Sequence, residues 1–128
     1  WSSDVCSSDL HVEAAAGLWA AVERGDVEGV IAAHGVTTLH YLAARTMTEV
    51  FARRCVSDVL TVFAVAPVDA AVLRDALSLE FSDFEDAVCA AAASATGCQA
   101  IVTRDRRGFK KARVPALTPA EALAIVLA

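Results

Sequence analysis

The acidic stretch at residues 82–87 has the residue types and the spacing that metal-ion chemistry requires. It reads SDFEDA and opens an alanine-rich helical pattern, so the sequence predicts a helix that begins at Ser82. Ser82 and Glu85 have the S-x-x-E spacing of a capping box. Asp83 and Asp86 are three residues apart and would share one face of that helix. In the plainer interpretation these acids complement the helix dipole, by about 0.3–1 kcal/mol each. The alternative is that they bind a cation.

A second candidate carboxylate follows an apolar run nearer the end of the chain. Residues 99–105 read QAIVTRD, which predicts a strand with Asp105 just beyond its end. Ligands of open α/β sheets bind at the carboxyl ends of the strands, although an ordinary turn aspartate is common there too. Asp105 and Asp86 can converge on one hard cation, and carboxylate oxygens suit Mg²⁺ or Mn²⁺.

Basic side chains are concentrated beside Asp105, although the whole chain has a net charge of −5. Six of the eleven basic residues lie within ten positions: Arg104, Arg106, Arg107, Lys110, Lys111 and Arg113. A phosphate responds to this local charge rather than to the net charge. Carboxylates for a metal ion next to cations for a phosphate are the arrangement that metal-assisted phosphodiester cleavage needs. The plainer alternative is a solvated basic loop.

Short apolar runs alternate with helical patterns along the chain. The runs at residues 27–33, 63–66 and 99–105 predict buried strands, and a further short strand precedes a last helix capped by Thr118, with Pro119 in its first position. Helical spacing predicts the other helices at residues 11–24, 36–45, 49–63, 70–77 and 82–96, the first ended by Gly25 and the last by Gly97. Thr37 or Thr38 is expected near the start of its helix. In the helix at 49–63, the side chains expected to face inward are Val50, Phe51, Cys55, Val59, Leu60 and Phe63.

This alternation predicts a single α/β domain with a parallel sheet covered by helices on both faces. Only three strands are clear, which is few for such a sheet. The 128 residues suffice for one domain with a real core. No apolar run reaches the roughly 18 residues that cross a bilayer, and residues 1–10 lack the features of a signal peptide. The four cysteines form no CxxC pair, so reduced thiols and a cytoplasmic protein are expected.

Three stretches together resemble a PIN domain, over a region from about residue 11 to the end of the chain. They are AAHGVTTLHYLAAR, EFSDFEDAVCAAAASATGCQAIVTRDRRGF and VPALTPAEAL. The resemblance implies a compact three-layer α/β/α nuclease with a central parallel sheet, dependent on Mg²⁺ or Mn²⁺ and typically cutting RNA. Many bacterial members are VapC-like toxins restrained by an antitoxin, and dimers are usual. The expected partners are therefore RNA, an antitoxin and a second copy of the chain, without a membrane.

The resemblance also implies roles for particular residues. The family site uses three or four carboxylates; Asp86 and Asp105 match two of them as metal ligands, and Asp83 is the most plausible additional acid. Arg104, Arg106, Arg107 and Lys110 would hold the RNA backbone. Where many relatives have Glu on an early helix, this chain has His40, which together with Thr38 could support the site. Packing of the imidazole and capping by the threonine are the plainer alternatives.

The start of the chain departs from the family pattern, which begins with a strand and an aspartate in a sequence like VLLDTN. Upstream of His11 there are only ten residues, WSSDVCSSDL, with no apolar β-branched run. They resemble the conceptual translation of a sequencing-adapter oligonucleotide joined to a truncated reading frame. The hypothesis is that residues 1–10 are non-native or disordered, and that residues 11–128 form a PIN-like domain without its first central strand and first catalytic aspartate. Resequencing of the locus tests it, and activity of this exact chain is expected to be impaired.

Two other classes of function are considered. A non-catalytic PIN-like module that binds RNA or a protein is favoured weakly by His40 in place of Glu. A phosphotransfer domain of the receiver type would need a nucleophilic Asp after a first or third strand and a nearby Lys. Asp105 follows a late strand, which disfavours the receiver type.

Overall fold

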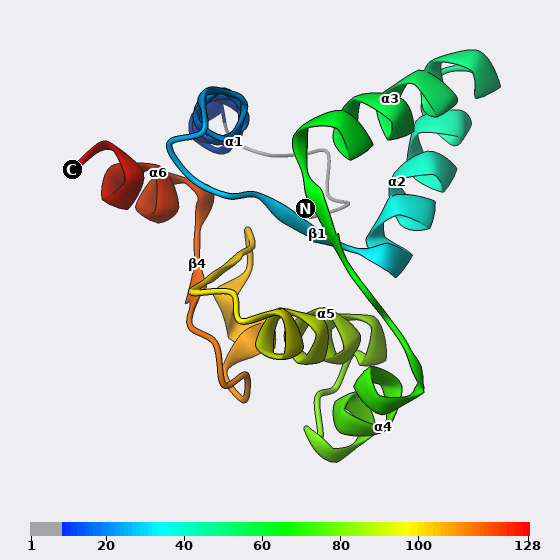
Figure 1. Ribbon diagram of the computed structural model, residues 1–128, viewed down its shortest axis with the longest axis vertical. Helices are drawn as coiled ribbons and strands as arrows, with labels where there is room; N and C mark the ends of the chain where they lie inside the picture. The colour runs from blue at the N-terminus through cyan, green and yellow to red at the C-terminus, as the bar shows by residue number, and fades with distance from the viewer. Residues whose placement is uncertain (1–8) are drawn as a thin grey trace.

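The computed structural model describes residues 9–128, with side chains from Glu13 onward. Residues 1–8 of the segment predicted to be non-native lie outside the described part. The helices are α1 (Asp9–Arg24), α2 (Ala33–Thr46), α3 (Glu49–Val62), α4 (Ala70–Ser78), α5 (Phe84–Thr96), a 3₁₀-helix η1 (Arg106–Phe109) and α6 (Pro119–Leu127) (Figure 1). The strands are β1 (Val30–Ala32), β2 (Ala64–Ala66), β3 (Ile101–Val102) and β4 (Ala116–Leu117). None of the described helices is long and apolar enough to span a membrane.

The strands form two separate parallel pairs. β1 pairs with β2, with Ile31 opposite Val65, and β3 pairs with β4, with Ile101 opposite Ala116. Within residues 9–128 no ladder joins the two pairs. The elements are those of an α/β protein, but the single central sheet predicted from the sequence does not appear as one hydrogen-bonded sheet in this part of the chain. The strands are also shorter than predicted, and β1 ends at Ala32 because α2 begins at Ala33.

The start of α2 differs from the prediction of a helix that begins near Thr37 or Thr38. The hydroxyls of Thr37 and Thr38 donate to the carbonyl oxygen of His34, at 2.7 and 3.2 Å. A capping hydroxyl accepts from a backbone N–H at the helix start, so neither threonine caps α2. The cap position is Ala32, which has no side-chain hydrogen bond. The helix therefore continues from β1 and begins three residues earlier than predicted.

Helix α3 exposes much of the face that was predicted to be buried. Val50 is 74% exposed, Leu60 is 50% exposed and Phe51 is 42% exposed, whereas Ala52 and Val59 are buried. The prediction was wrong for Val50, Leu60 and Phe51 because α3 packs mainly on α2, as an antiparallel hairpin (Figure 1). A single partner helix covers only one stripe of α3, and the apolar residues outside that stripe remain in contact with solvent.

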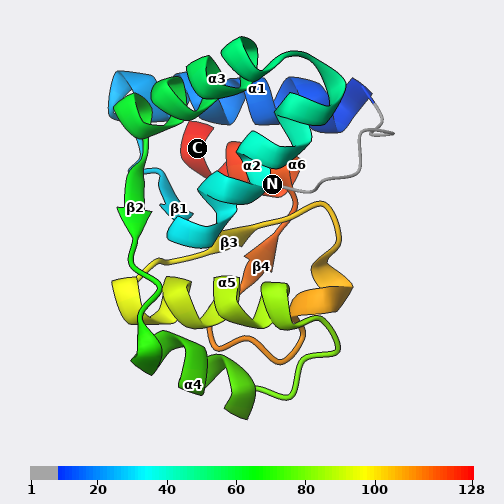
Figure 2. The same ribbon diagram turned by 90° about the vertical axis from the view of Figure 1, so that its right-hand side faces the viewer.

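The hydrophobic core that supports the acidic segment lies between α4, α5 and strand β2. Its buried members are mostly alanines and valines: Ala66, Val72, Ala76, Ala87, Val88, Ala91 and Ala92. Small side chains let the helices approach closely, and α4 and α5 lie side by side in both views (Figures 1 and 2). The buried side of α5 therefore faces this core, and the acidic first turn of the helix lies at its edge.

Candidate active site

The acidic segment begins α5, but the residue that caps the helix is Asp83. The Oδ1 atom of Asp83 accepts a hydrogen bond from the backbone N–H of Asp86 at 3.0 Å, and helix α5 starts at Phe84. The predicted capping box of Ser82 and Glu85 is therefore wrong. A carboxylate one residue further along satisfies the free N–H groups of the first turn instead. Asp83 thus lies at the cap position of α5, and its charge is close enough to Asp86 to raise the pKa of that carboxyl.

Asp86 is a half-buried carboxylate surrounded by other acids. Burial raises its pKa above the ordinary value, and the charges of Asp83, Glu85 and Asp105 raise it further. Gly108 lies close against it, since a Cβ atom at that position would be 3.2 Å from the Oδ2 atom of Asp86. The basic segment around η1 therefore lies against the start of α5, and the two halves of the predicted site come together in space.

Asp105 lies in a different environment, at the amino end of η1. Its Oδ1 atom accepts two hydrogen bonds from Arg107, one from the backbone N and one from Nε, both at 3.1 Å. These bonds hold the pKa of Asp105 below its usual range. Asp105 is exposed, unlike Asp86. The two predicted metal ligands are thus near enough to interact; among the residues that the structure describes, Asp105 has a cationic partner in an ion pair and Asp86 has none.

The arrangement does not amount to a complete metal site. Among the side chains that the structure describes, no three His, Cys, Asp or Glu residues come close enough together to hold an ion. A hard cation such as Mg²⁺ favours an octahedral shell of oxygens, some of them from water, and needs at least one or two well-placed carboxylates. Asp83, Asp86 and Asp105 supply negative charge to one region without forming that shell, so the described residues do not by themselves fit the ion.

A row of polar side chains on α2 lies against α5. The sequence had indicated Thr38 as a residue that could support the site, but it had not indicated His34. The hydroxyl of Thr38 donates to the Oε1 atom of Glu85 at 3.4 Å. One turn away, the Nε2 atom of His34 lies 3.4 Å from the Sγ atom of Cys89. Burial raises the pKa of Cys89 to about 11, so the thiol keeps its proton and can donate it to the imidazole. His34 and Thr38 are four residues apart on α2, and Glu85 and Cys89 are four residues apart on α5. This equal spacing was the signal in the sequence that the two rows of side chains could lie against each other.

His40 lies on another side of α2, away from the start of α5. Its Nε2 atom is 2.9 Å from a carboxylate oxygen of Glu49, which also pairs with Arg53 at 3.0 Å. Arg53 and His40 together lower the pKa of Glu49. His40 and Arg53 also border a hollow of about 360 Å³ between α2 and α3. The structure therefore places Thr38, and not His40, beside the acidic segment.

The basic run is largely engaged with acids and carbonyls of the protein itself. Arg106 pairs with Glu121 at 3.2 Å, Arg113 pairs with Asp75, and Lys111 donates to the carbonyl oxygen of Glu80 at 3.2 Å. Within the described residues, Lys110 makes no hydrogen bond or ion pair, and the Nε atom of Arg104 is buried without a partner. Since most of these cations are already paired, fewer are available to a phosphate than the sequence indicated.

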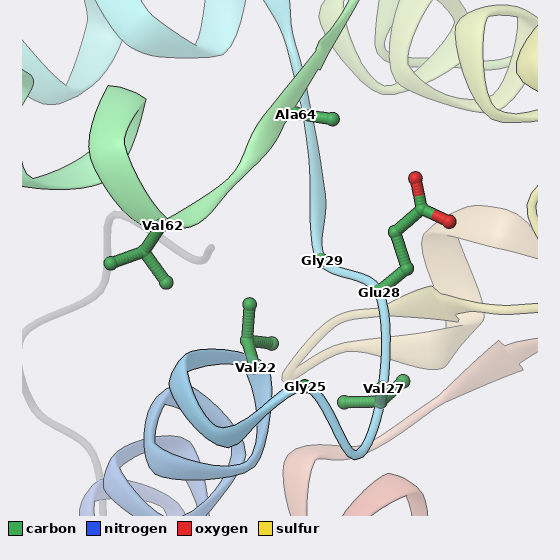
Figure 3. Close-up of a pocket in the computed structure, with 7 residues that line it drawn as sticks. All are labelled: Val22, Gly25, Val27, Glu28, Gly29, Val62 and Ala64. Carbon is green, nitrogen blue, oxygen red and sulfur yellow. The ribbon is translucent and has the colours of Figure 1, made fainter.

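A separate hollow of about 350 Å³ lies at the amino ends of β1 and β2 (Figure 3). It is lined by Val22, Gly25, Val27, Glu28, Gly29, Val62 and Ala64. Glu28 is its single charged residue, and no acid of the α5 or η1 segments borders it. Its lining offers no converging set of polar groups, so we do not assign the chemistry to it.

The chain belongs to the PIN domain family, because a family model with the description PIN domain matches residues 3–107. The match includes the segments that hold Asp83, Asp86 and Asp105, and it confirms the resemblance drawn from the sequence. PIN domains are generally nucleases that use divalent metal ions. No curated protein and no solved structure matched the chain in the other two comparisons.

Proposed function

We propose that the protein is an endoribonuclease that depends on Mg²⁺ or Mn²⁺. The observation that carries this proposal is the position of Asp86, half-buried, with a pKa raised by burial and by three neighbouring carboxylates, and with Gly108 of the basic segment against it. Negative charge concentrated in this way favours a bound cation. The family membership supports the nuclease class.

In this proposal each residue has a role that follows from its surroundings. Asp86 and Asp105 are the metal ligands, and Asp83 holds the first turn of α5 in place through its cap. If Asp86 and Asp105 held a divalent ion, that ion would supply an activated water and would offset charge on the leaving oxygen. Lys110 and the arginines at 104, 106 and 107 contact RNA phosphates, which orients the strand without reading its bases.

We propose that the active architecture is the three-layer α/β/α arrangement with one central parallel sheet. The support is that both strand pairs within residues 9–128 are parallel, so that one further parallel strand between them would join them in a single sheet. A first strand followed by an aspartate, in a pattern like VLLDTN, would supply both the joining strand and a further carboxylate near Asp86. The incomplete ligand set among the described residues agrees with that requirement.

We also propose that the nuclease is the cytoplasmic, homodimeric toxin of a toxin–antitoxin pair. The support is the resemblance to VapC-like members of the family. The genomic neighbourhood tests the pairing: a short upstream frame for a small DNA-binding protein is expected, and its absence counts against the toxin role. Sedimentation of the purified chain tests the dimer.

Substitution of the two proposed ligands tests the enzymatic function. In the chain extended with a VLLDTN-like start, Asp86→Asn and Asp105→Asn should each lower Mg²⁺-dependent cleavage of single-stranded RNA by about 100-fold or more, since loss of even an outer partner of a metal ligand costs 10- to 100-fold. Asp58→Asn, at an exposed position of α3, is the matched control and should leave cleavage unchanged. Cleavage that survives EDTA or both ligand substitutions would contradict the proposal.

The second candidate function is a non-catalytic module that binds RNA or a protein. It is favoured by the lack of a three-ligand group among the described side chains and by the pairing of His40 with Glu49 rather than with the acidic segment. A binding module should retain its RNA affinity in the Asp86→Asn and Asp105→Asn variants, and the extended chain should show no cleavage at all.

A further inference from the structure

The last two cations of the basic segment at residues 104–113 are bound to helices α4 and α5. A guanidinium nitrogen of Arg113 pairs with the carboxylate of Asp75 in α4, and its Nε–H donates to the hydroxyl oxygen of Ser94 in α5 at 3.4 Å. Lys111 donates to the carbonyl oxygen of Glu80, in the turn between the two helices, at 3.2 Å. The residues that follow η1 are therefore held by α4, by α5 and by the turn that joins them.

An aromatic contact holds η1 itself against the same turn. The rings of Phe81 and Phe109 meet edge to face with their centroids 5.9 Å apart, and Phe109 is buried. Glu80, which precedes Phe81, lies in the left-handed conformation at φ 57°, which residues with a Cβ atom rarely adopt. The turn keeps this unfavourable conformation while the Glu80 carbonyl binds Lys111 and the Phe81 ring packs on η1.

These contacts determine where the basic segment meets the acidic start of α5. Gly108, in the middle of the segment, lies so close that a Cβ atom there would be 3.2 Å from the Oδ2 atom of Asp86. Lys111 and Arg113 are the two cations of the segment to which the proposed function gives no contact with RNA. Both are bound to groups of the protein that lie on one side of the segment, so their contacts fix its position.

We propose that Arg113 is a positioning residue, whose ion pair with Asp75 docks the basic segment on α4 and so places the RNA-binding cations, while Arg113 itself contacts no phosphate. This inference rests on the proposed function. The Arg113 side chain is 52% exposed and that of Asp75 is 36% exposed, so the pair alone is a modest interaction. The contacts of Lys111 and Phe109 hold the same short segment. Loss of the pair therefore loosens the segment without unfolding the chain.

Substitution of Asp75 distinguishes this role from a phosphate contact, because the two roles predict opposite signs. If Arg113 bound a phosphate, Asp75→Asn would free the guanidinium and remove an acid, and RNA binding would strengthen. A docking role predicts that Asp75→Asn and Arg113→Gln both weaken binding of a fluorescent 2′-O-methyl RNA to the full chain of 128 residues. The expected loss is about two- to fivefold for each, which is the range that one exposed ion pair allows. Stronger binding by Asp75→Asn would overturn the inference.

A double variant tests whether the ion pair itself is the cause. Asp75→Arg together with Arg113→Asp keeps the net charge and restores the pair with its partners exchanged. This double variant should recover most of the RNA affinity that each single variant loses. A phosphate contact would instead be replaced by an acid, and the affinity would fall below that of Arg113→Gln. Such a fall would overturn the positioning role.

The chain offers a matched control in the pair of Arg24 and Asp26. This pair is also exposed, with its Nε and Oδ2 atoms 3.0 Å apart, and it lies outside α4, α5 and the basic segment. Asp26→Asn thus removes one acid and breaks one Arg–Asp pair, as Asp75→Asn does, and it should not weaken RNA binding. Equal weakening by the two variants would overturn the inference.

Hydrogen exchange measures the docking in the absence of RNA. The amide of Ala112, between Lys111 and Arg113, donates to the carbonyl oxygen of Phe109 at 3.0 Å. Its exchange should be about two- to fivefold faster in Asp75→Asn and in Arg113→Gln, and it should return to the original rate in the double variant. An unchanged rate in both single variants would overturn the docking role.

The two proposals fail in distinguishable ways. If Lys110→Gln weakens RNA binding but Asp75→Asn leaves it unchanged or strengthens it, the positioning role is wrong and the RNA-directed function stands. If neither the unaltered chain nor the chain extended with a VLLDTN-like start binds RNA, the proposed function is wrong and the positioning role is wrong with it.

Discussion

Asp86 and Asp105 are both aspartates, but their pKa values are shifted in opposite directions. Burial and neighbouring acids raise the pKa of Asp86, whereas Arg107 lowers the pKa of Asp105. The cause is local, because one side chain lies half-buried under Gly108 among carboxylates and the other lies exposed beside a guanidinium. At neutral pH, Asp86 is therefore the acid whose charge works against the fold. Sites retained for function commonly carry such a cost in stability.

Removal of that charge should stabilise the protein in a pH-dependent way. A raised folded-state pKa means that the folded protein binds the proton more tightly than the unfolded chain does. The stabilisation from protonated Asp86 is complete below its ordinary value of 3.8 and is lost as the pH rises through the raised value. Asp86→Asn should therefore increase the free energy of unfolding at pH 7 and change it little at pH 3, as measured in urea.

The control for this prediction is Asp105→Asn, which should have the opposite sign. The lowered pKa of Asp105 means that its charged form stabilises the folded state, and this contribution is lost as the pH falls through the lowered value. The substitution should slightly decrease the free energy of unfolding at pH 7. If Asp86→Asn is destabilising at pH 7, its carboxylate is not under the repulsion inferred here.

At the scale of secondary structure, the start of α5 shows how one residue decides the position of a helix. Ser82 and Asp83 are both good caps, and the structure uses the second. The choice moves the helix start by one residue and turns the Asp83 carboxylate toward the N–H of Asp86. The Asp83 cap therefore also holds the backbone of Asp86, the proposed metal ligand.

Substitution of the two possible caps separates their roles. Asp83→Ala should lower the free energy of unfolding by about 1 kcal/mol, the usual cost of a lost cap. Ser82→Ala should change it by no more than about 0.5 kcal/mol, as for an ordinary surface position. Urea unfolding at pH 7 measures both. Asp83→Asn keeps a good cap while removing the charge, so it should remain near the unaltered chain. A larger loss in the free energy of unfolding for Ser82→Ala than for Asp83→Ala would show that Ser82, and not Asp83, caps the helix.

At the scale of the whole molecule, the two parallel strand pairs are the feature that bears most on activity. β1–β2 adjoins α5 and its acids, and β3–β4 leads to Asp105 and η1, without a ladder between the pairs in residues 9–128. The relative position of Asp86 and Asp105 thus depends on helix packing and on the contact of η1 with α5. A sheet that joined the pairs would hold both carboxylates more firmly.

Activity should follow the completeness of that sheet. The chain of 128 residues should show little or no Mg²⁺-dependent cleavage of RNA, since its described side chains bring together no group of three possible metal ligands. The same chain with a VLLDTN-like strand at its start should gain cleavage, measured on labelled RNA with EDTA as the control. Robust metal-dependent cleavage by the chain as it stands would contradict the need for that strand.

The end of α5 and the start of α6 were predictable because their signals lie within a few residues of one another, whereas the starts of α2 and α5 were predicted wrongly. Gly97 ends α5 in the left-handed conformation at φ 79°, where a residue without Cβ is favoured. Thr118 and Glu121 form the capping box of α6, with Pro119 in the first turn. Each depends on local backbone geometry and on side chains three or four positions apart.

Other features that were wrongly predicted or missed depend on segments far apart in the chain. Three of them are the exposed side of α3, the contact of Thr38 with Glu85 and the separation of the strand pairs. All three follow from which elements pack on one another, and the hydrophobic pattern of a single segment does not contain that information. The candidate acids could be named from residue type and spacing. Their opposite pKa shifts could not, because burial and the position of Arg107 arise only when η1 packs on α5.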